Sequence, residues 1–179
     1  MSTKLRAGVV GVGSMGWNHA RIYGELDNAE LTAIYDPNPA AAEKAVRKFG
    51  GTVATSLDDL ITRCEAVSVA APTALHYEIV MKLLAADRHV LVEKPIAETP
   101  GQAAEMADLA RARGLVLQVG HIERFNPALD ALEQRLNRPR FLEVTRLSPY
   151  PGRSLDIGVV IDVMIHDLDI ILHLVKSPV

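Results

Sequence analysis

Aromatic residues make up only 4% of this 179-residue chain, and the sequence contains a single cysteine. Its core must therefore be mainly aliphatic, which suits parallel strands covered by helices on both faces. Hydrophobic residues form 49% of the chain, enough for a sizeable core. Because Cys64 has no partner for an internal disulfide, we expect a reducing, cytoplasmic location.

The chain lacks an excess of positive charge, since 19 Lys and Arg residues against 22 Asp and Glu give a formal net charge of −3. The chain has no basic tract, so we expect no nucleic-acid partner. One apolar stretch, residues 155–175, is long enough to resemble a membrane span. It contains four aspartates, which lipid would strongly disfavour, so it predicts a helix packed on protein and no membrane partner.

Short apolar runs alternate with helical patterns up to residue 119, which predicts a parallel sheet of right-handed βαβ units. The expected strands cover residues 5–10, 31–35, 53–55, 66–71, 89–92 and 115–119. The expected helices cover residues 17–26, 39–49, 57–63, 76–86 and 100–113. Ser56 and Thr99 precede two of these helices and are expected to cap them.

The pattern changes after Gly120, so we expect a first domain over residues 1–120 and part of a second over 121–179. The second part predicts a helix over 127–136, a strand over 141–147 and a long helix over 159–175. A lone strand leaves its backbone groups unpaired. Either the second domain is a truncated α+β unit, or a partner supplies the rest of its sheet.

A glycine-rich segment, Gly11–Gly16, has the pattern G-x-G-x-x-G between an expected strand and an expected helix. An acidic residue, Asp36, follows it by twenty positions at the end of the next strand. This context predicts a Rossmann-type dinucleotide site, with pyrophosphate at the helix N-terminus and Asp36 on the adenosine ribose. Asp36 would repel a 2′-phosphate, which favours NAD over NADP. The cofactor-binding residues expected here are Gly11, Gly13, Ser14, Met15, Gly16 and Asp36.

Two further motifs follow later strands, namely Pro72-Thr73 with His76 and then Glu93-Lys94-Pro95. A third, Asp162 with His166, lies on the expected last helix. Together with the glycine motif they resemble the Gfo/Idh/MocA oxidoreductase family along essentially the whole chain. The resemblance implies that Lys94 orients the substrate hydroxyl and the nicotinamide, that His166 is the acid/base, and that Asp162 supports it. It implies further cofactor contacts from Ala71, Pro72, Thr73, His76, Glu93 and Gln118.

The proposed acid/base chemistry suits these residue types. Oxidation of a secondary alcohol needs a base for the hydroxyl proton, and histidine serves near neutral pH. Asp162 and His166 are four residues apart and would share one helix face, although a simple stabilising pair remains an open alternative. His166, Asp169 and His173 share a face as well, but further metal ligands are not evident, so we expect no metal.

The stretch Glu123-Arg124-Phe125-Asn126-Pro127 and the loop containing Arg153 resemble the UDP-N-acetylglucosamine 3-dehydrogenase group of this family. The resemblance implies oxidation of a sugar-nucleotide 3-hydroxyl. Arg124 and Arg153 could bind a diphosphate, or they could lie on the surface or in structural ion pairs. The expected substrate-binding residues are Lys94, His121, Arg124, Asn126, Arg153 and His166.

Two other functions remain open at this point. One is a non-catalytic NAD-binding or redox-sensing module, against which Lys94, Asp162 and His166 argue. The other is an NADP-dependent reductase of small carbonyls, against which Asp36 argues. Full members of the family usually form dimers or tetramers, so the resemblance implies a homo-oligomer in the full-length form.

Overall fold

The computed structural model describes residues 3–137, 139, 141–147 and 160–176. It divides into two compact units, Met1–Gly120 and His121–Val179. Each unit is described separately below. No helix in the described ranges combines the length and apolar character needed to cross a membrane.

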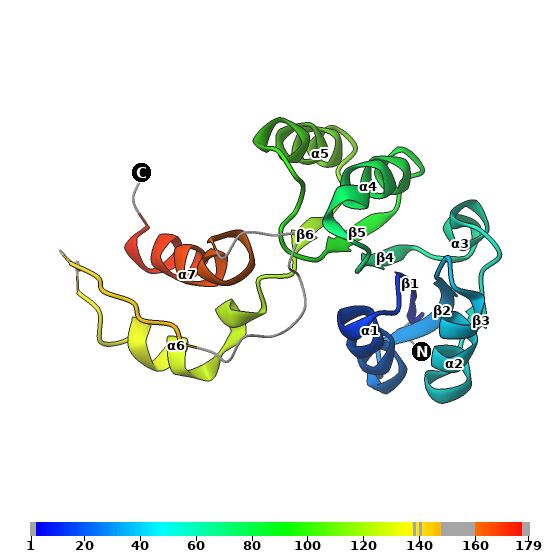
Figure 1. The fold of residues 1–179 in the computed structure, drawn as a ribbon, viewed down its shortest axis with the longest axis horizontal. Helices are drawn as coiled ribbons and strands as arrows, with labels where there is room; N and C mark the ends of the chain where they lie inside the picture. Colours follow the sequence, from blue (N-terminus) through cyan, green and yellow to red (C-terminus); the bar gives the residue numbers. More distant parts are fainter. Residues whose placement is uncertain (1–2, 138, 140, 148–159, 177–179) are drawn as a thin grey trace. The chain divides into compact units, whose positions relative to one another are not determined.

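The first unit is built on a six-stranded parallel sheet in the order β3-β2-β1-β4-β5-β6 (Figure 1). Its strands are β1 (Leu5–Val10), β2 (Ala29–Tyr35), β3 (Thr52–Val53), β4 (Ala66–Val69), β5 (His89–Val92) and β6 (Leu117–Val119). Its helices are α1 (Ser14–Glu25), α2 (Pro39–Phe49), α3 (Leu57–Arg63), α4 (His76–Ala85) and α5 (Pro100–Ala112). This architecture confirms the Rossmann-type doubly wound sheet, with α1 starting three residues earlier than expected.

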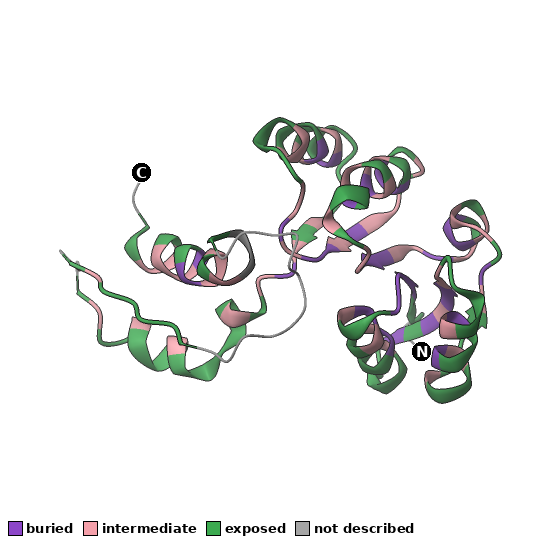
Figure 2. Ribbon diagram, viewed as in Figure 1, coloured by how far each residue is buried: buried purple, intermediate pink, exposed green. Residues whose placement is uncertain are grey.

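Helices cover both faces because successive strand residues point to opposite sides. Val9 packs in the cluster formed with α1 and α2, whereas Val10 packs in the cluster formed with α3, α4 and α5. Figure 1 shows α1 and α2 on one side of the sheet and α4 and α5 on the other, and Figure 2 shows buried residues both on the strands and on these helices. The strand order reverses between β1 and β4, and doubly wound sheets bind ligands at such a switch point.

Local sequence signals set the starts of the helices. Asp59 N–H donates to Ser56 Oγ at 3.1 Å, so Ser56 caps α3 as expected. Gln102 N–H donates to Thr99 Oγ1 at 3.2 Å, and Thr99 N–H donates to Gln102 Oε1 at 3.3 Å. This reciprocal capping box begins α5 at Pro100.

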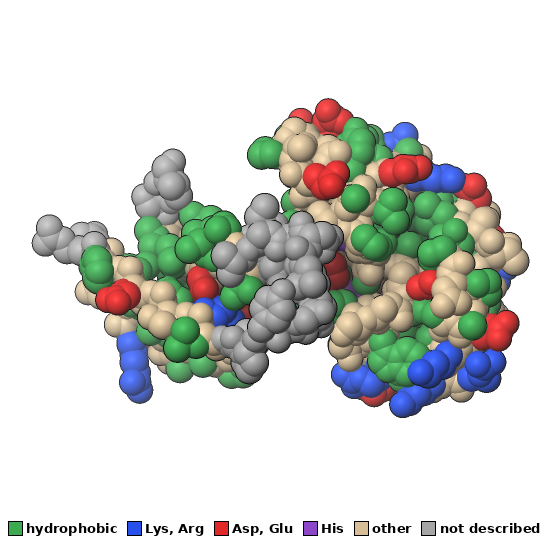
Figure 3. All heavy atoms as spheres, viewed as in Figure 1, with side chains coloured by type: hydrophobic (Ala, Val, Ile, Leu, Met, Phe, Trp, Pro, Cys, Tyr) green, Lys and Arg blue, Asp and Glu red, His purple; other side chains and the backbone are tan. Residues whose placement is uncertain are grey.

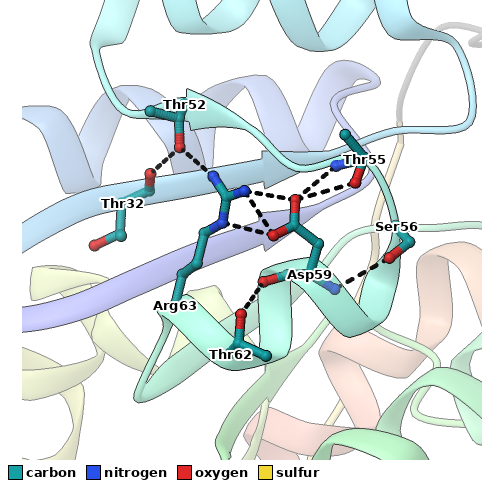
Figure 4. A network of polar contacts seen from close by, with 7 residues as sticks. All are labelled: Thr32, Thr52, Thr55, Ser56, Asp59, Thr62 and Arg63. Carbon is teal, nitrogen blue, oxygen red and sulfur yellow. Dashed lines mark hydrogen bonds and ion pairs between the residues drawn. The ribbon is translucent and has the colours of Figure 1, made fainter.

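A polar network holds the short strand β3 against α3 (Figure 4). Arg63 Nε and Nη2 donate to the two carboxylate oxygens of Asp59 at 2.8 and 2.7 Å. Arg63 Nη1 donates to Thr52 Oγ1 at 3.0 Å, and Thr52 Oγ1 donates to Thr32 O at 3.0 Å. Thr55 N–H donates to Asp59 at 2.9 Å, so one ion pair connects β2, β3 and the start of α3.

The outer surface of α1 and α2 carries a cluster of lysine and arginine side chains (Figure 3). Lys44 Nζ and Lys48 Nζ lie 5.4 and 5.7 Å from the centroid of the Trp17 ring. Trp17 also meets Phe49 edge-on at 4.8 Å between ring centroids. These contacts join the helix that follows the glycine loop to α2.

Cys64 directly follows α3 and is 1% exposed. A Cβ atom on Gly8 would lie 2.7 Å from Cys64 Sγ, so the strand needs glycine at that position. Burial raises the pKa of the Cys64 thiol to about 11, so the reactive thiolate is scarce at neutral pH.

We therefore expect the native chain to resist alkylation by iodoacetamide at pH 7.5, and the denatured chain to be alkylated readily. Mass spectrometry gives an unambiguous result because Cys64 is the single cysteine. Equal rates of alkylation with and without denaturant would contradict the buried position of this thiol.

The second unit contains two α-helices in its described part, α6 (Pro127–Glu133) and α7 (Ile165–Val175). A 3₁₀ turn over Ile122–Phe125 precedes α6, and a π-helical turn over Val160–Met164 precedes α7. The helix expected over 127–136 therefore ends at Glu133, and the long helix expected from 159 is described from Val160.

The strand predicted over residues 141–147 is wrong, because this segment has no regular secondary structure. Its β-prone sequence finds no neighbouring strand to pair with among the described residues of the unit. Phe141 and Leu147 are 81% and 90% exposed, so these two apolar side chains are uncovered as well. β-propensity yields a strand when cross-strand partners stabilise it.

Candidate functional site

The candidate site lies at the edge of the first unit where parallel strands end. Backbone hydrogen bonds continue past the strands there: Gly11 N–H donates to Tyr35 O and Ala70 N–H to Val10 O, both at 2.8 Å. Gly120 N–H likewise donates to Val92 O at 2.8 Å. The segments that follow β1, β2, β4, β5 and β6 are thus placed along one edge, as the topology requires.

Each motif glycine has a different steric environment. Gly11 has a φ of +81°, and a Cβ there would lie 2.8 Å from Ala70 O. A Cβ on Gly16 would lie 1.8 Å from Gly11 O, so the helix sits directly on the loop. A Cβ on Gly13 would have nothing within 4 Å. Gly13 therefore faces open space where α1 begins, the place where a phosphate approaches a helix N-terminus.

Asp36 ties the end of β2 to the glycine loop. Val12 N–H donates to Asp36 Oδ2, and Asn38 N–H donates to Asp36 Oδ1, both at 2.8 Å. An ionised carboxylate offers about four lone-pair sites, so these two bonds leave capacity for ribose hydroxyls. The structure thus places Asp36 beside the predicted pyrophosphate loop.

Glu93 follows β5 and is 6% exposed. Its Oε1 lies 2.9 Å from His19 Nε2 of α1, and Lys94 N–H donates to Oε2 at 3.3 Å. Burial alone would raise the pKa of the Glu93 carboxyl, but the hydrogen bond and charge of His19, with smaller contributions from Lys94, lower it overall. Glu93 is therefore held as a carboxylate facing His19.

His76 joins the segments that follow β4 and β5. It is 1% exposed, with Nδ1 2.9 Å from Pro95 O and Nε2 2.8 Å from Ala71 O. A neutral imidazole has one N–H to donate, whereas the doubly protonated ring can donate to both carbonyls. His76 acts here as an anchor for two loops, and its direct contact with cofactor stays a prediction.

The remaining predicted residues of this unit differ in exposure and location. Lys94 is half-buried at the site edge, where the Lys94–Pro95 peptide is cis. Met15, Ala71 and Thr73 are half-buried, and Ser14 and Pro72 are exposed.

Gln118, another predicted cofactor contact, lies inside β6 and is paired in register with Leu91. It lines a hollow of about 260 Å³ together with Leu5 and Tyr23. The structure therefore does not place Gln118 beyond its strand end with the glycine loop.

In the second unit, Arg124 forms an ion pair with Asp169. Arg124 Nε donates to Asp169 Oδ2 at 2.7 Å, and Nη2 contacts Oδ1 in a bidentate pair. Burial alone would raise the pKa of Asp169, but Arg124 and the nearby histidines lower it. His121 Nε2 lies 4.0 Å from Asp169 Oδ1. The structural ion pair, one of the alternatives left open by the sequence, thus holds for Arg124.

Asn126 also has a structural role, because its side-chain oxygen accepts a hydrogen bond from Ala128 N–H at 3.0 Å. Asn126 thereby caps the start of α6. His166 is half-buried in the first turn of α7. Asp162 falls in the π-helical turn, and its side chain lies outside the described residues, as does Arg153.

Two of the ion pairs that the sequence analysis did not predict involve or adjoin predicted site residues. Arg146 Nε donates to Asp167 Oδ1 at 2.9 Å, next to His166 in the chain. His19 pairs with Glu93 across 74 positions. One signal for His19 was available, since Gly16 packs on the loop and His19, three residues later, shares that helix face.

Comparisons with known proteins agree with this arrangement. The family profile described as "Oxidoreductase family, NAD-binding Rossmann fold" matches residues 5–121. The UDP-N-acetylglucosamine 3-dehydrogenase of Acidithiobacillus ferrooxidans is 38% identical over 171 residues, which cover 95% of this chain and 54% of that protein. This chain thus spans about half the length of the curated relative.

Solved structures show the same similarity. The structure of UDP-N-acetylglucosamine 3-dehydrogenase GnnA from Acidithiobacillus ferrooxidans superposes with a TM-score of 0.92 at 37% identity, covering 97% of this chain and 57% of that one. The structure of GenD2 from gentamicin A biosynthesis in complex with NAD gives a TM-score of 0.72 at 32% identity, covering 75% of this chain and 39% of that one.

Proposed function

This chain belongs to the Gfo/Idh/MocA oxidoreductase family, with an NAD-binding Rossmann fold over residues 5–121, and we propose that it serves NAD-dependent oxidation of a secondary alcohol on a sugar nucleotide. Our best candidate for the oxidised group is the 3-hydroxyl of UDP-N-acetylglucosamine. The similarity to the Acidithiobacillus ferrooxidans 3-dehydrogenase supports this substrate over other sugars.

The observation that carries the cofactor proposal is the open space at Gly13, where a Cβ would meet nothing within 4 Å. The surrounding loop is held tightly, because Gly16 packs on Gly11 and Asp36 accepts Val12 N–H. Pyrophosphate would lie at the start of α1, and the adenosine ribose would lie against Asp36. The residues present therefore fit NAD.

Lys94 and His166 would be the residues that act on the alcohol being oxidised. When bound, the nicotinamide ring accepts a hydride from the alcohol carbon. Lys94 would orient the hydroxyl through its ammonium N–H groups, and His166 would take the hydroxyl proton on a ring nitrogen. Asp162 would hold the imidazole in the required orientation. Because Arg124 is paired with Asp169, Arg153 is the better candidate for the substrate diphosphate.

The first experiment is a calorimetric titration of the chain with NAD and NADP, each repeated with UDP-N-acetylglucosamine present. We expect NAD to bind more tightly than NADP and more tightly still with the sugar nucleotide. Lys94→Met should still bind NAD, but its NAD affinity should no longer increase when the sugar nucleotide is present. Lys82→Met, which breaks a surface ion pair with Asp58, is the control and should keep both the NAD affinity and its increase with the sugar nucleotide.

Three outcomes would count against the proposal. NAD binding that is unaffected by the sugar would contradict the proposed substrate and favour a non-catalytic NAD-binding module. Tighter binding of NADP would contradict the role of Asp36. A folded chain that binds neither dinucleotide would contradict the proposed cofactor. The cytoplasmic location and the homo-oligomer stay predictions.

A further inference from the structure

We propose that His19 is a positioning residue for Lys94 and acts through the carboxylate of Glu93. The inference rests on the role proposed above for Lys94. It connects α1, whose N-terminus receives the pyrophosphate, with the segment after β5 that presents the lysine.

His19 reaches the sheet from the face of α1 that carries Gly16. Its side chain is 11% exposed and its Nε2 lies 2.9 Å from Glu93 Oε1, whose side chain is 8% exposed. A charge-assisted hydrogen bond with so little solvent contact is short and strong compared with a surface pair. The helix of the glycine loop is thus attached to the residue immediately before Lys94.

The Glu93 carboxylate has little room to move. Its Oε1, Cδ and Oε2 atoms lie 3.1, 3.2 and 3.2 Å from the position that a Cβ on Gly120 would occupy. It also accepts Lys94 N–H at 3.3 Å. The carboxylate is thus confined by α1, by the residue after β6 and by the backbone of Lys94. A displacement of His19 would therefore also move the Lys94 peptide.

The other side of Lys94 is anchored separately, since His76 Nδ1 lies 2.9 Å from Pro95 O. Lys94 therefore lies between two residues that are held by histidines from different helices, α1 and α4. The His19 contact links the lysine to the glycine loop, and the His76 contact links it to the segment at Ala71.

The test compares three variants of the chain, measured without cofactor. His19→Leu removes the donor to Glu93, and His19→Gln keeps an N–H that can reach the carboxylate. Tyr23→Phe is the matched control, because the Tyr23 hydroxyl attaches the same helix to Ser68 of β4 at 2.8 Å. The readout is the rate of Lys94 acetylation by sulfo-N-hydroxysuccinimide acetate, followed by mass spectrometry relative to the exposed Lys4.

We expect His19→Leu to change the relative acetylation rate of Lys94 by about threefold, a modest coupling for residues in one network. In His19→Gln the rate should stay near that of the original chain. In Tyr23→Phe the rate should be unchanged, even if the melting temperature falls by as much as it does in His19→Leu. NAD affinity, measured in parallel by calorimetry, should fall in His19→Leu and be restored in His19→Gln.

An unchanged Lys94 rate in His19→Leu, or an equal change in Tyr23→Phe, would overturn the proposal. If His19→Leu does not fold, Gly120→Ala provides the same test, because its Cβ would push the carboxylate from the other side. A Lys94 rate unaffected by Gly120→Ala would then overturn it. Failure of the original chain to bind NAD would contradict the proposed function alone, since the acetylation rate does not depend on cofactor.

Discussion

We expect replacement of Gly16 with alanine to destabilise the first unit and thereby abolish NAD binding, whereas replacement of Gly13 with alanine should weaken NAD binding strongly and leave the unit stable. This is the largest difference in the free energy of unfolding that we expect between two positions of the glycine motif. The Gly16 Cβ would lie 1.8 Å from Gly11 O and 2.8 Å from Gly11 C. Both are backbone atoms, so no side-chain rearrangement relieves the clash, and we expect a loss of about 3 kcal/mol or more.

Gly13 presents the opposite case. Its φ of −65° suits alanine, and its Cβ would meet no atom within 4 Å. The free energy of unfolding should change by less than about 0.5 kcal/mol, as for an ordinary surface substitution. The methyl group would occupy the space that the pyrophosphate needs, so NAD affinity should fall by about 100-fold, equivalent to about 2.7 kcal/mol.

Thermal unfolding and NAD calorimetry on both variants test this contrast. Gly101→Ala in α5 is the matched control, because its Cβ would lie 3.9 Å from the nearest atom and far along the chain from the loop. It should leave NAD affinity unchanged and raise the free energy of unfolding by about 1 kcal/mol or less, because alanine favours the helix over glycine. A Gly13→Ala variant with full NAD affinity would contradict pyrophosphate binding at this loop, and a stable Gly16→Ala variant would contradict the described loop geometry.

Asp36→Asn should weaken NAD binding by about 10- to 100-fold, the range for losing a charge-assisted hydrogen bond. The carboxylate accepts Val12 N–H and Asn38 N–H on different oxygens. Asparagine has one oxygen, so its amide group would face one of these donors. The change therefore disturbs the glycine loop and removes an acceptor for the ribose.

The same variant should narrow the preference for NAD over NADP, because the negative charge that repels the 2′-phosphate is lost. Calorimetry with both dinucleotides measures the ratio of the two affinities. Asp27→Asn, an exposed acid in the turn after α1, is the control for a change of net charge. An unchanged ratio in Asp36→Asn would show that Asp36 does not select the cofactor.

The order of strands and helices in the first unit was predictable from the sequence because its signals are local. Continuous apolar runs separated by helical patterns specified the parallel sheet, and Ser56 and Thr99 marked helix starts through hydrogen bonds to residues three positions on. The glycine motif was predictable for the same reason, since its steric demands arise within one turn and the adjoining strand.

Tertiary structure decided what depends on a distant partner. The segment 141–147 has a strand-like sequence but no described neighbour to pair with, so it forms no strand. Arg124 is 45 positions from Asp169, and His19 is 74 positions from Glu93. No local pattern specifies which charged groups meet when separate elements pack, because that choice depends on the burial and geometry that the completed fold imposes.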